Sequence, residues 1–178
     1  MFKRSVILIG MPGSGKSTIG RIVAEACGMD FVDTDHLLAE EIGMSLQEYL
    51  DRFGMESFAE KERDILSGLS GSETPRIIAT GGSAVLYPDA AENLKKAGTV
   101  VFLDCDLPLL RKRLWNFESR GIVIDGVKDR EQAILDLYMT REPLYYKYSD
   151  IRISQSGKSK KTIVSQVIKS VEEYEAGT

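Results

Sequence analysis

A glycine-rich segment near the N-terminus carries the most specific chemistry in the chain. Residues 10–17 read G-M-P-G-S-G-K-S and directly follow the apolar run 5–9. Such glycines let the backbone curl until successive N–H groups point at phosphate oxygens, while Lys16 adds a cation and Ser17 a hydroxyl group suited to Mg²⁺. The pattern predicts a phosphate-binding loop for ATP or GTP between a strand and a helix. The predicted nucleotide-binding residues here are Gly13, Ser14, Gly15, Lys16, Ser17 and Thr18.

A pair of aspartates follows the apolar residues 31–32. Asp33 and Asp35 are two positions apart, so in an extended segment both carboxylates can face the phosphate loop. Two acids beside a phosphate site repel one another, and a metal ion would relieve that repulsion. The alternative is structural, because an aspartate at either position could cap the helix that follows.

Gly81 and Gly82 follow another apolar run, 76–79. A backbone without side chains at this point would let substrate hydroxyl groups or the γ-phosphate approach closely. An ordinary turn from strand to helix is the alternative interpretation.

Arginines supply the candidate anion-binding side chains. Arg113, Arg120 and Arg141 could each bind a phosphate or carboxylate, since the planar guanidinium suits both groups. Arg113 could instead lie on a solvated helix face, and Arg141 could pair with Glu142 or Asp136 at the surface. We expect Pro143 to end the helix and so to fix the position of Arg141.

Short apolar runs alternate with stretches of helical periodicity and would position these residues. The runs lie at 5–9, 31–32, 76–79, 99–103 and 150–153. This alternation predicts an α/β fold: one P-loop NTPase-like domain over 1–178, a three-layer sandwich with a parallel sheet and helices on both faces. Ligands bind beyond the carboxyl ends of such strands, where all the polar motifs fall. Residues 115–129 lack periodicity and are predicted to form a mobile lid.

Composition limits the classes of partner. The chain has 178 residues with 23 Lys and Arg against 27 Asp and Glu, a net charge of −4, and no long basic run. Nucleic acid and membrane surfaces are therefore poor partners, and we expect a monomeric protein that binds a small molecule. Cys27 and Cys105 form no reactive pair motif and, with no export or membrane signal visible, suit reduced thiols in the cytoplasm.

Taken together, the order and spacing of these motifs resemble the shikimate kinase family over nearly the whole chain. The resemblance implies ATP and Mg²⁺ as cofactors and transfer of the γ-phosphoryl group to a hydroxyl of a small carboxylate metabolite, shikimate, giving shikimate 3-phosphate. It also implies a role in amino-acid biosynthesis, with the substrate-binding helices at about 35–69.

The resemblance implies a role for each candidate residue. Asp33 and Ser17 would hold Mg²⁺, and Asp35 would accept a hydrogen bond from the substrate hydroxyl and could take its proton. The catalytic residues would be Lys16, Asp35 and Arg120, the last in the lid over the transferred phosphate. Arg113 would lie near the adenine. Arg141 would bind the substrate carboxylate, beside Gly81 and Gly82.

The match breaks on the substrate side. Where the family carries a carboxylate-binding arginine after the phenylalanine of its substrate helix, this chain has Ala59, and the third glycine after the third strand is Ser83. Lys61 is a poor substitute because its offset turns it to another helix face. With Glu56 and Glu60 nearby, homoserine kinase is the alternative: Arg141 would bind the carboxylate of the amino acid and an acid its ammonium group.

Other nucleotide-binding classes fit less well. A GTPase needs a guanine-reading N-K-x-D run, which the sequence lacks, and a nucleoside-monophosphate kinase needs a basic acceptor pocket, from which Ala59 removes a cation. A nucleotide binder without catalysis would not need Asp33 and Asp35. The sequence therefore favours a small-molecule kinase.

Overall fold

The computed structural model describes residues 2–69, 74–114 and 130–178. The strands are β1 (Ser5–Ile9), β2 (Asp30–Asp33), β3 (Arg76–Ala79), β4 (Gly98–Asp104) and β5 (Ile151–Ser154). The helices are α1 (Lys16–Cys27), α2 (Thr34–Ile42), α3 (Leu46–Gly68), the short 3-10 helix η2 (Ala84–Leu86), α4 (Pro88–Ala97), α5 (Leu107–Leu114), α6 (Arg130–Tyr148) and α7 (Lys160–Gly177).

The strands form one parallel sheet in the order β2-β3-β1-β4-β5, and each predicted apolar run overlaps one of them. β1 is central: Ile7 lies beside Ile78 of β3 and beside Val100 of β4. β1 lies between β3 and β4, two strands that the chain reaches only later. Ligands bind at such a change of strand order in an open α/β sheet. The predicted fold class is confirmed.

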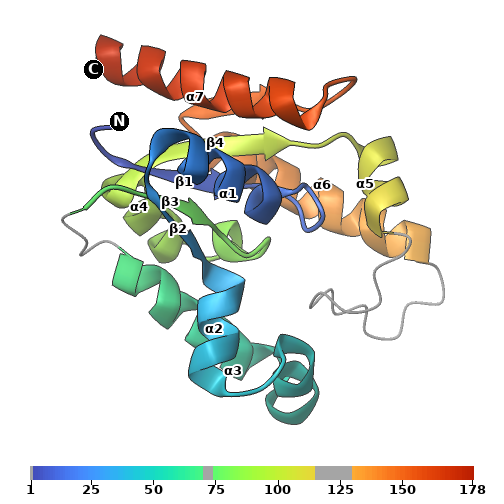
Figure 1. The fold of residues 1–178 in the computed structure, drawn as a ribbon. Helices are drawn as coiled ribbons and strands as arrows, with labels where there is room; N and C mark the ends of the chain where they lie inside the picture. The colour runs from blue at the N-terminus through green and yellow to red at the C-terminus, as the bar shows by residue number, and fades with distance from the viewer. Residues whose placement is uncertain (1, 70–73, 115–129) are drawn as a thin grey trace.

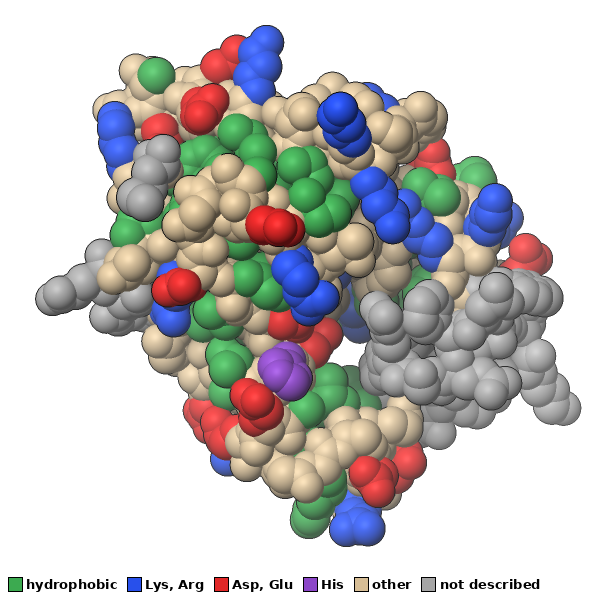
Figure 2. Space-filling model, viewed as in Figure 1, with side chains coloured by type: hydrophobic (Ala, Val, Ile, Leu, Met, Phe, Trp, Pro, Cys, Tyr) green, Lys and Arg blue, Asp and Glu red, His purple; other side chains and the backbone are tan. Residues whose placement is uncertain are grey.

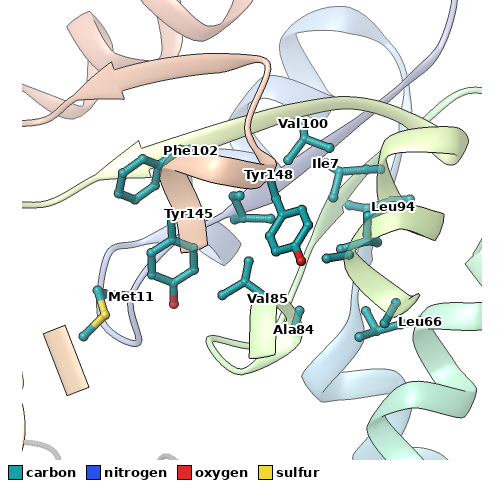
Figure 3. Close-up of a cluster of buried hydrophobic side chains, with 14 of the residues drawn as sticks. Ile7, Met11, Leu66, Ala84, Val85, Leu94, Val100, Phe102, Tyr145 and Tyr148 are labelled. Carbon is teal, nitrogen blue, oxygen red and sulfur yellow. The ribbon is translucent and has the colours of Figure 1, made fainter. Parts of the chain in front are cut away.

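Both faces of the sheet are buried, because side chains of a strand alternate between them. Val6 and Leu8 of β1 pack in a core with α1 and α7. Ile7 belongs to the core on the other face, with residues of α4, α5 and α6. Figure 1 shows α1 and α7 covering one face, with α4 and α6 on the other. In Figure 3, Phe102 and Tyr145 lie together in this second core, their ring centroids 5.1 Å apart.

Helices α2 and α3 have a small core of their own. Leu38, Leu50 and Phe58 are buried there, away from the two sheet cores. A capping box joins Ser45 to Glu48 at the start of α3, and Gly54 interrupts the helix with φ 77° and ψ 175°. From Met55 onward α3 is a regular helix. Its helical period therefore determines which of its side chains face the sheet.

The structure differs from expectation at Pro143. The proline lies inside α6, which continues to Tyr148, so the prediction that it ends the helix is wrong. A proline costs the helix one hydrogen bond, but the buried Tyr145 and Tyr148 anchor the following turn in the sheet core. The predicted lid, 115–129, lies outside the described residues. Within the described ranges, no helix combines the length and apolarity needed to cross a membrane.

Candidate active site

The phosphate-binding loop joins β1 to α1, as predicted. Gly13 and Gly15 have φ values of 76° and 90°, in the left-handed region that favours glycine. Gly15 is the N-cap of α1 and brings no side chain to compete for the first N–H groups of the helix. The positive end of α1 therefore faces the loop, which is the arrangement that binds a phosphate group.

Lys16 is buried and holds the loop closed. Its Nζ donates to the carbonyl oxygens of Gly10 at 2.8 Å and Met11 at 3.0 Å. Its ammonium group thus lies over the curled backbone, where the oxygens of a bound phosphate would compete with these carbonyl groups. Lys16 also lines a cavity with Ser17 and Thr18, the other residues predicted at the end of the loop.

Arg113 braces the phosphate loop from α5. Its Nη1 donates to the carbonyl oxygens of Gly13 at 3.2 Å and Ser14 at 3.0 Å, and to Gln155 Oε1 at 3.1 Å. Gln155 is buried, and its Nε2 donates to the same Ser14 carbonyl at 2.8 Å. Arg113 is therefore not simply part of a solvated helix face. Gln155 was not among the predicted site residues, although its position directly after β5 could have suggested a role.

Arg113 and Gln155 also border a cavity of about 230 Å³ beside the loop, with Lys160 and Ile163 of α7. Gly13 and Gly15 line this cavity, and Arg113 Nη1 also lies 3.6 Å from the Cys105 sulfur. Burial raises the pKa of the Cys105 thiol to about 11, so this sulfur stays protonated at neutral pH.

Asp33 and Asp35 lie where β2 passes into α2. Asp33 is the N-cap of α2, and its Oδ1 accepts the Asp35 backbone N–H at 3.1 Å, so the structural interpretation is right for Asp33. Both carboxylates also line, with Ser17, a cavity of about 600 Å³. A cap uses one carboxylate oxygen and leaves the other able to face a ligand. Capping and ligand binding are therefore compatible at Asp33.

Three side chains hold the loop that follows β3. The Gly81 N–H donates to Thr34 Oγ1 at 2.9 Å, and the Tyr145 hydroxyl donates to the Gly82 carbonyl at 2.7 Å. Ser83 Oγ donates to Glu62, with both carboxylate oxygens 2.7 Å away. The loop leads into η2 and α4, so it is also the strand-to-helix turn that the alternative proposed.

Glycine is required in this loop by close contacts. A Cβ at Gly81 would lie 2.5 Å from Glu62 Oε1 and 2.7 Å from Asp35 Oδ1, so the two carboxylates flank this residue. A Cβ at Gly82 would lie 2.6 Å from Pro12 Cδ, so the loop after β3 rests directly on the phosphate loop.

Glu62 is the most buried carboxylate of this region, with 2% of its surface exposed. Burial raises its pKa, and the nearby Asp35 raises it further, whereas hydrogen bonds with Ser83 and Tyr87 and the charge of Arg141 lower it. Tyr87 was not among the predicted site residues. No short-range sequence signal marks it, because its partner Glu62 lies in α3, far away in the sequence.

Arg141 points into the site from α6. It lines the same cavity as Lys16 and Asp35 and hydrogen-bonds with Tyr145. Glu142 instead accepts a hydrogen bond from Tyr138 at 2.6 Å. The structure therefore favours a ligand-facing Arg141 over a surface pair.

One cavity brings most of the predicted residues together. Its volume is about 110 Å³, and its polar wall includes Lys16, Asp35, Gly82 and Arg141. Side chains from α3 form the apolar wall: Leu46, Leu50, Met55 and Phe58. Figure 2 shows the molecule hollowed between the α2–α3 helices and the body of the sheet. Arg120, the remaining predicted catalytic residue, lies outside the described residues.

Comparison with known proteins agrees with this geometry. The family model described as shikimate kinase matches residues 12–172. The chain belongs to the shikimate kinase family. A shikimate kinase of Xylella fastidiosa is 36% identical over 164 residues, covering 92% of this chain and 89% of the relative. One of Geobacter sulfurreducens is 34% identical, covering 97% and 93%. As a member of this family the chain is a small-molecule kinase, a phosphotransferase with a hydroxyl acceptor.

Solved structures of shikimate kinases share the fold. The enzyme of Acinetobacter baumannii in complex with shikimate superimposes with a TM-score of 0.88 at 26% identity, covering 97% of this chain and 95% of that chain. The Aquifex aeolicus enzyme gives a TM-score of 0.81 at 26% identity, covering 98% and 99%. A gluconokinase from Sinorhizobium meliloti, at 19% identity and a TM-score of 0.62, is similar in fold alone.

One difference between the shikimate kinase pattern and this chain lies on α3. Ala59 is only partly exposed and does not line the described cavity. Lys61 pairs with Glu41 at 2.9 Å and so points to another surface, as predicted. Glu56 and Glu60 are exposed and do not line the cavity either, so the expectation that they could bind a substrate ammonium group is wrong. The acid that lines the cavity is Asp35, and Glu62 lies next to it beside Gly81.

Proposed function

We propose that this chain phosphorylates shikimate, transferring the γ-phosphoryl group of ATP to a hydroxyl group and giving shikimate 3-phosphate. The observation that carries this proposal is the single cavity in which the phosphate loop meets Asp35, Gly82 and Arg141. A donor site and a polar acceptor site share one wall there, as direct transfer between two bound substrates requires.

The phosphate loop and Lys16 would bind and orient the transferred phosphate. Phosphoryl transfer spreads negative charge over the phosphate oxygens, and the N–H groups of Gly13 and Gly15, with the Lys16 ammonium, would be the donors to them. Arg113 would bind the nucleotide side. Arg120 remains a prediction from the family resemblance, as the residue that would cover the transferred phosphate.

The residues beside the loop suit Mg²⁺. Ser17, Asp33 and Asp35 present hard oxygen ligands along one cavity, the kind of donor that this ion prefers. Among the described residues, no group of three or more acidic, histidine or cysteine side chains could hold a metal alone. Ser17 and Asp33 would therefore hold the ion together with phosphate oxygens and water, and the ion would neutralise charge on the phosphates.

Asp35 and Arg141 would position the acceptor. The Asp35 carboxylate would accept a hydrogen bond from the attacking hydroxyl and could take its proton. Arg141 would bind the acceptor carboxylate, beside the backbone of Gly81 and Gly82. No described feature favours homoserine, since the acids invoked for its ammonium group lie outside the cavity.

The test is turnover with MgATP, measured by coupled ADP release. Shikimate and L-homoserine are compared side by side, with a reaction that lacks any acceptor as the control. We expect ADP release above the control with shikimate only. Release with homoserine and none with shikimate would overturn the proposal.

A further inference from the structure

Among the described residues, the acceptor side of the cavity offers few positive charges to an anionic substrate. Lys16 is committed to the phosphate loop, so among the described residues that line the cavity, Arg141 is the one guanidinium left to face an acceptor. It shares this region with the carboxylates of Asp35 and Glu62, which flank Gly81. An acceptor with a carboxylate would gain from a second positive charge.

The regular part of α3 shows where that charge could come from. Met55 and Phe58 line the cavity, and Glu62 reaches the loop after β3. Residues four apart lie one above the other on a helix, so Ala59 and Arg63 continue the face that begins at Met55. Ala59 is short and leaves room above its turn for a neighbouring long side chain.

The Arg63 side chain turns back toward Ala59 and Tyr87. Long helical side chains point back toward the N-terminus, and Arg63 Nε donates to the Ala59 carbonyl at 3.2 Å. Its Cζ lies 5.5 Å from the centroid of the Tyr87 ring. Tyr87 lines the cavity and hydrogen-bonds with Glu62, so the guanidinium lies one aromatic ring away from the acceptor site.

The charges of Arg63 and Arg141 both affect the pKa of the Tyr87 hydroxyl group. Burial raises the pKa of Tyr87, and the charge of Glu62 raises it further, whereas the charges of Arg141 and Arg63 lower it. Arg63 is exposed, and exposed side chains change rotamer within roughly picoseconds to nanoseconds. A small rotation could therefore bring the guanidinium from the Tyr87 face to a bound anion.

We infer that Arg63 is a second cation of the acceptor site and recognises the carboxylate of the acceptor together with Arg141. This inference rests on the proposed function. Other cations of α3 are placed less well, because Lys61 pairs with Glu41 and Arg52 precedes the break at Gly54. Arg63 is thus a specificity-determining residue, and its contribution is to acceptor binding rather than to phosphoryl transfer.

The test compares Arg63→Gln with Arg52→Gln, an exposed arginine on the same helix. For Arg63→Gln we expect the KM for shikimate to rise about five- to tenfold, with kcat and the KM for ATP within about twofold of the wild type. Arg52→Gln should leave all three unchanged. With shikimate methyl ester, which lacks the negative charge, Arg63→Gln and the wild type should have equal KM values.

A charge-keeping variant separates charge from packing on Tyr87. Arg63→Lys should raise the KM for shikimate less than Arg63→Gln does, because a cation remains. Equal effects of the two variants, or an unchanged KM in Arg63→Gln, would overturn the role of Arg63 while leaving the proposed function in place. A wild-type protein that fails to phosphorylate shikimate would overturn both.

Discussion

The nucleotide side and the acceptor side of the cavity are built in different ways. On the nucleotide side, one short segment supplies the backbone donors and Lys16, and its supports, Arg113 and Gln155, bind backbone carbonyl groups. On the acceptor side, side chains from α2, α3, α6 and the loop after β3 meet through contacts such as Ser83 with Glu62. A contiguous motif therefore preserves phosphate binding, whereas acceptor choice depends on side chains that can change one at a time.

The largest effect should come from the nucleotide side. Lys16→Ala removes the buried ammonium that we propose binds the transferred phosphate, and we expect kcat to fall about a thousandfold. Steady-state turnover measures this, with Lys169→Ala, a change to an exposed lysine, as the control. A Lys16→Ala protein with full turnover would contradict the assignment of the phosphate loop as the donor site.

A change at the junction of the two sides should have the next largest effect. Asp35→Asn keeps the size of the side chain but removes its charge and its ability to take a proton, so kcat should fall about a hundredfold. The control is Asp51→Asn, an exposed aspartate that accepts a hydrogen bond from Gln47. If kcat stays near the wild-type value, Asp35 neither orients nor deprotonates the acceptor.

A change behind the phosphate loop should weaken ATP binding without weakening shikimate binding. Gln155→Leu removes the donor to the Ser14 carbonyl and the acceptor for Arg113, and an unpaired buried group costs about 1–3 kcal/mol. We expect the KM for ATP to rise about five- to tenfold and the KM for shikimate to stay within about twofold. Gln166→Leu, at an outer hydrogen bond with Lys158, is the control. Equal rises in both KM values would mean that the two sides do not respond separately.

The smallest effect concerns the pH dependence of stability on the acceptor side. Burial raises the pKa of Glu62 above its ordinary 4.5, so ionising this group costs stability in the folded state. As the pH rises above 4.5, the unfolding free energy of the wild type should fall relative to that of Glu62→Gln, by at most about 1.4 kcal/mol per pH unit until Glu62 is ionised. Urea unfolding at several pH values measures the difference. Parallel pH profiles would contradict it.

The sequence alone predicts the fold and the nucleotide side well, because both depend on local patterns. Strands such as 5–9 read as apolar runs, and the glycines of residues 10–17 are contiguous. The acceptor side was harder to predict. The partners Glu62 and Ser83 are 21 residues apart, and the Tyr145 contact with Gly82 spans 63 residues, so no short-range pattern reveals either.

Expectations based on one residue type also failed where tertiary packing decides the outcome. Pro143 does not end α6, because the buried tyrosines after it hold the helix against the core. Glu56 and Glu60 were expected near the substrate from their position in the sequence. The direction in which the helix faces leaves both exposed, and Glu62 turns inward instead.

The contact between Gly82 and Pro12 links the energetics of the two substrates. Since the loops that would hold donor and acceptor touch, any displacement of one on binding must be accommodated by the other. We expect the affinity for shikimate to differ between the free protein and its complex with a non-hydrolysable ATP analogue, a difference that titration calorimetry measures. Thermodynamic linkage then requires shikimate to change the affinity for the nucleotide by the same factor. The close approach of these two glycine-rich turns would thus make the affinity for each substrate depend on whether the other is bound, while the total binding free energy stays the same for either order of binding.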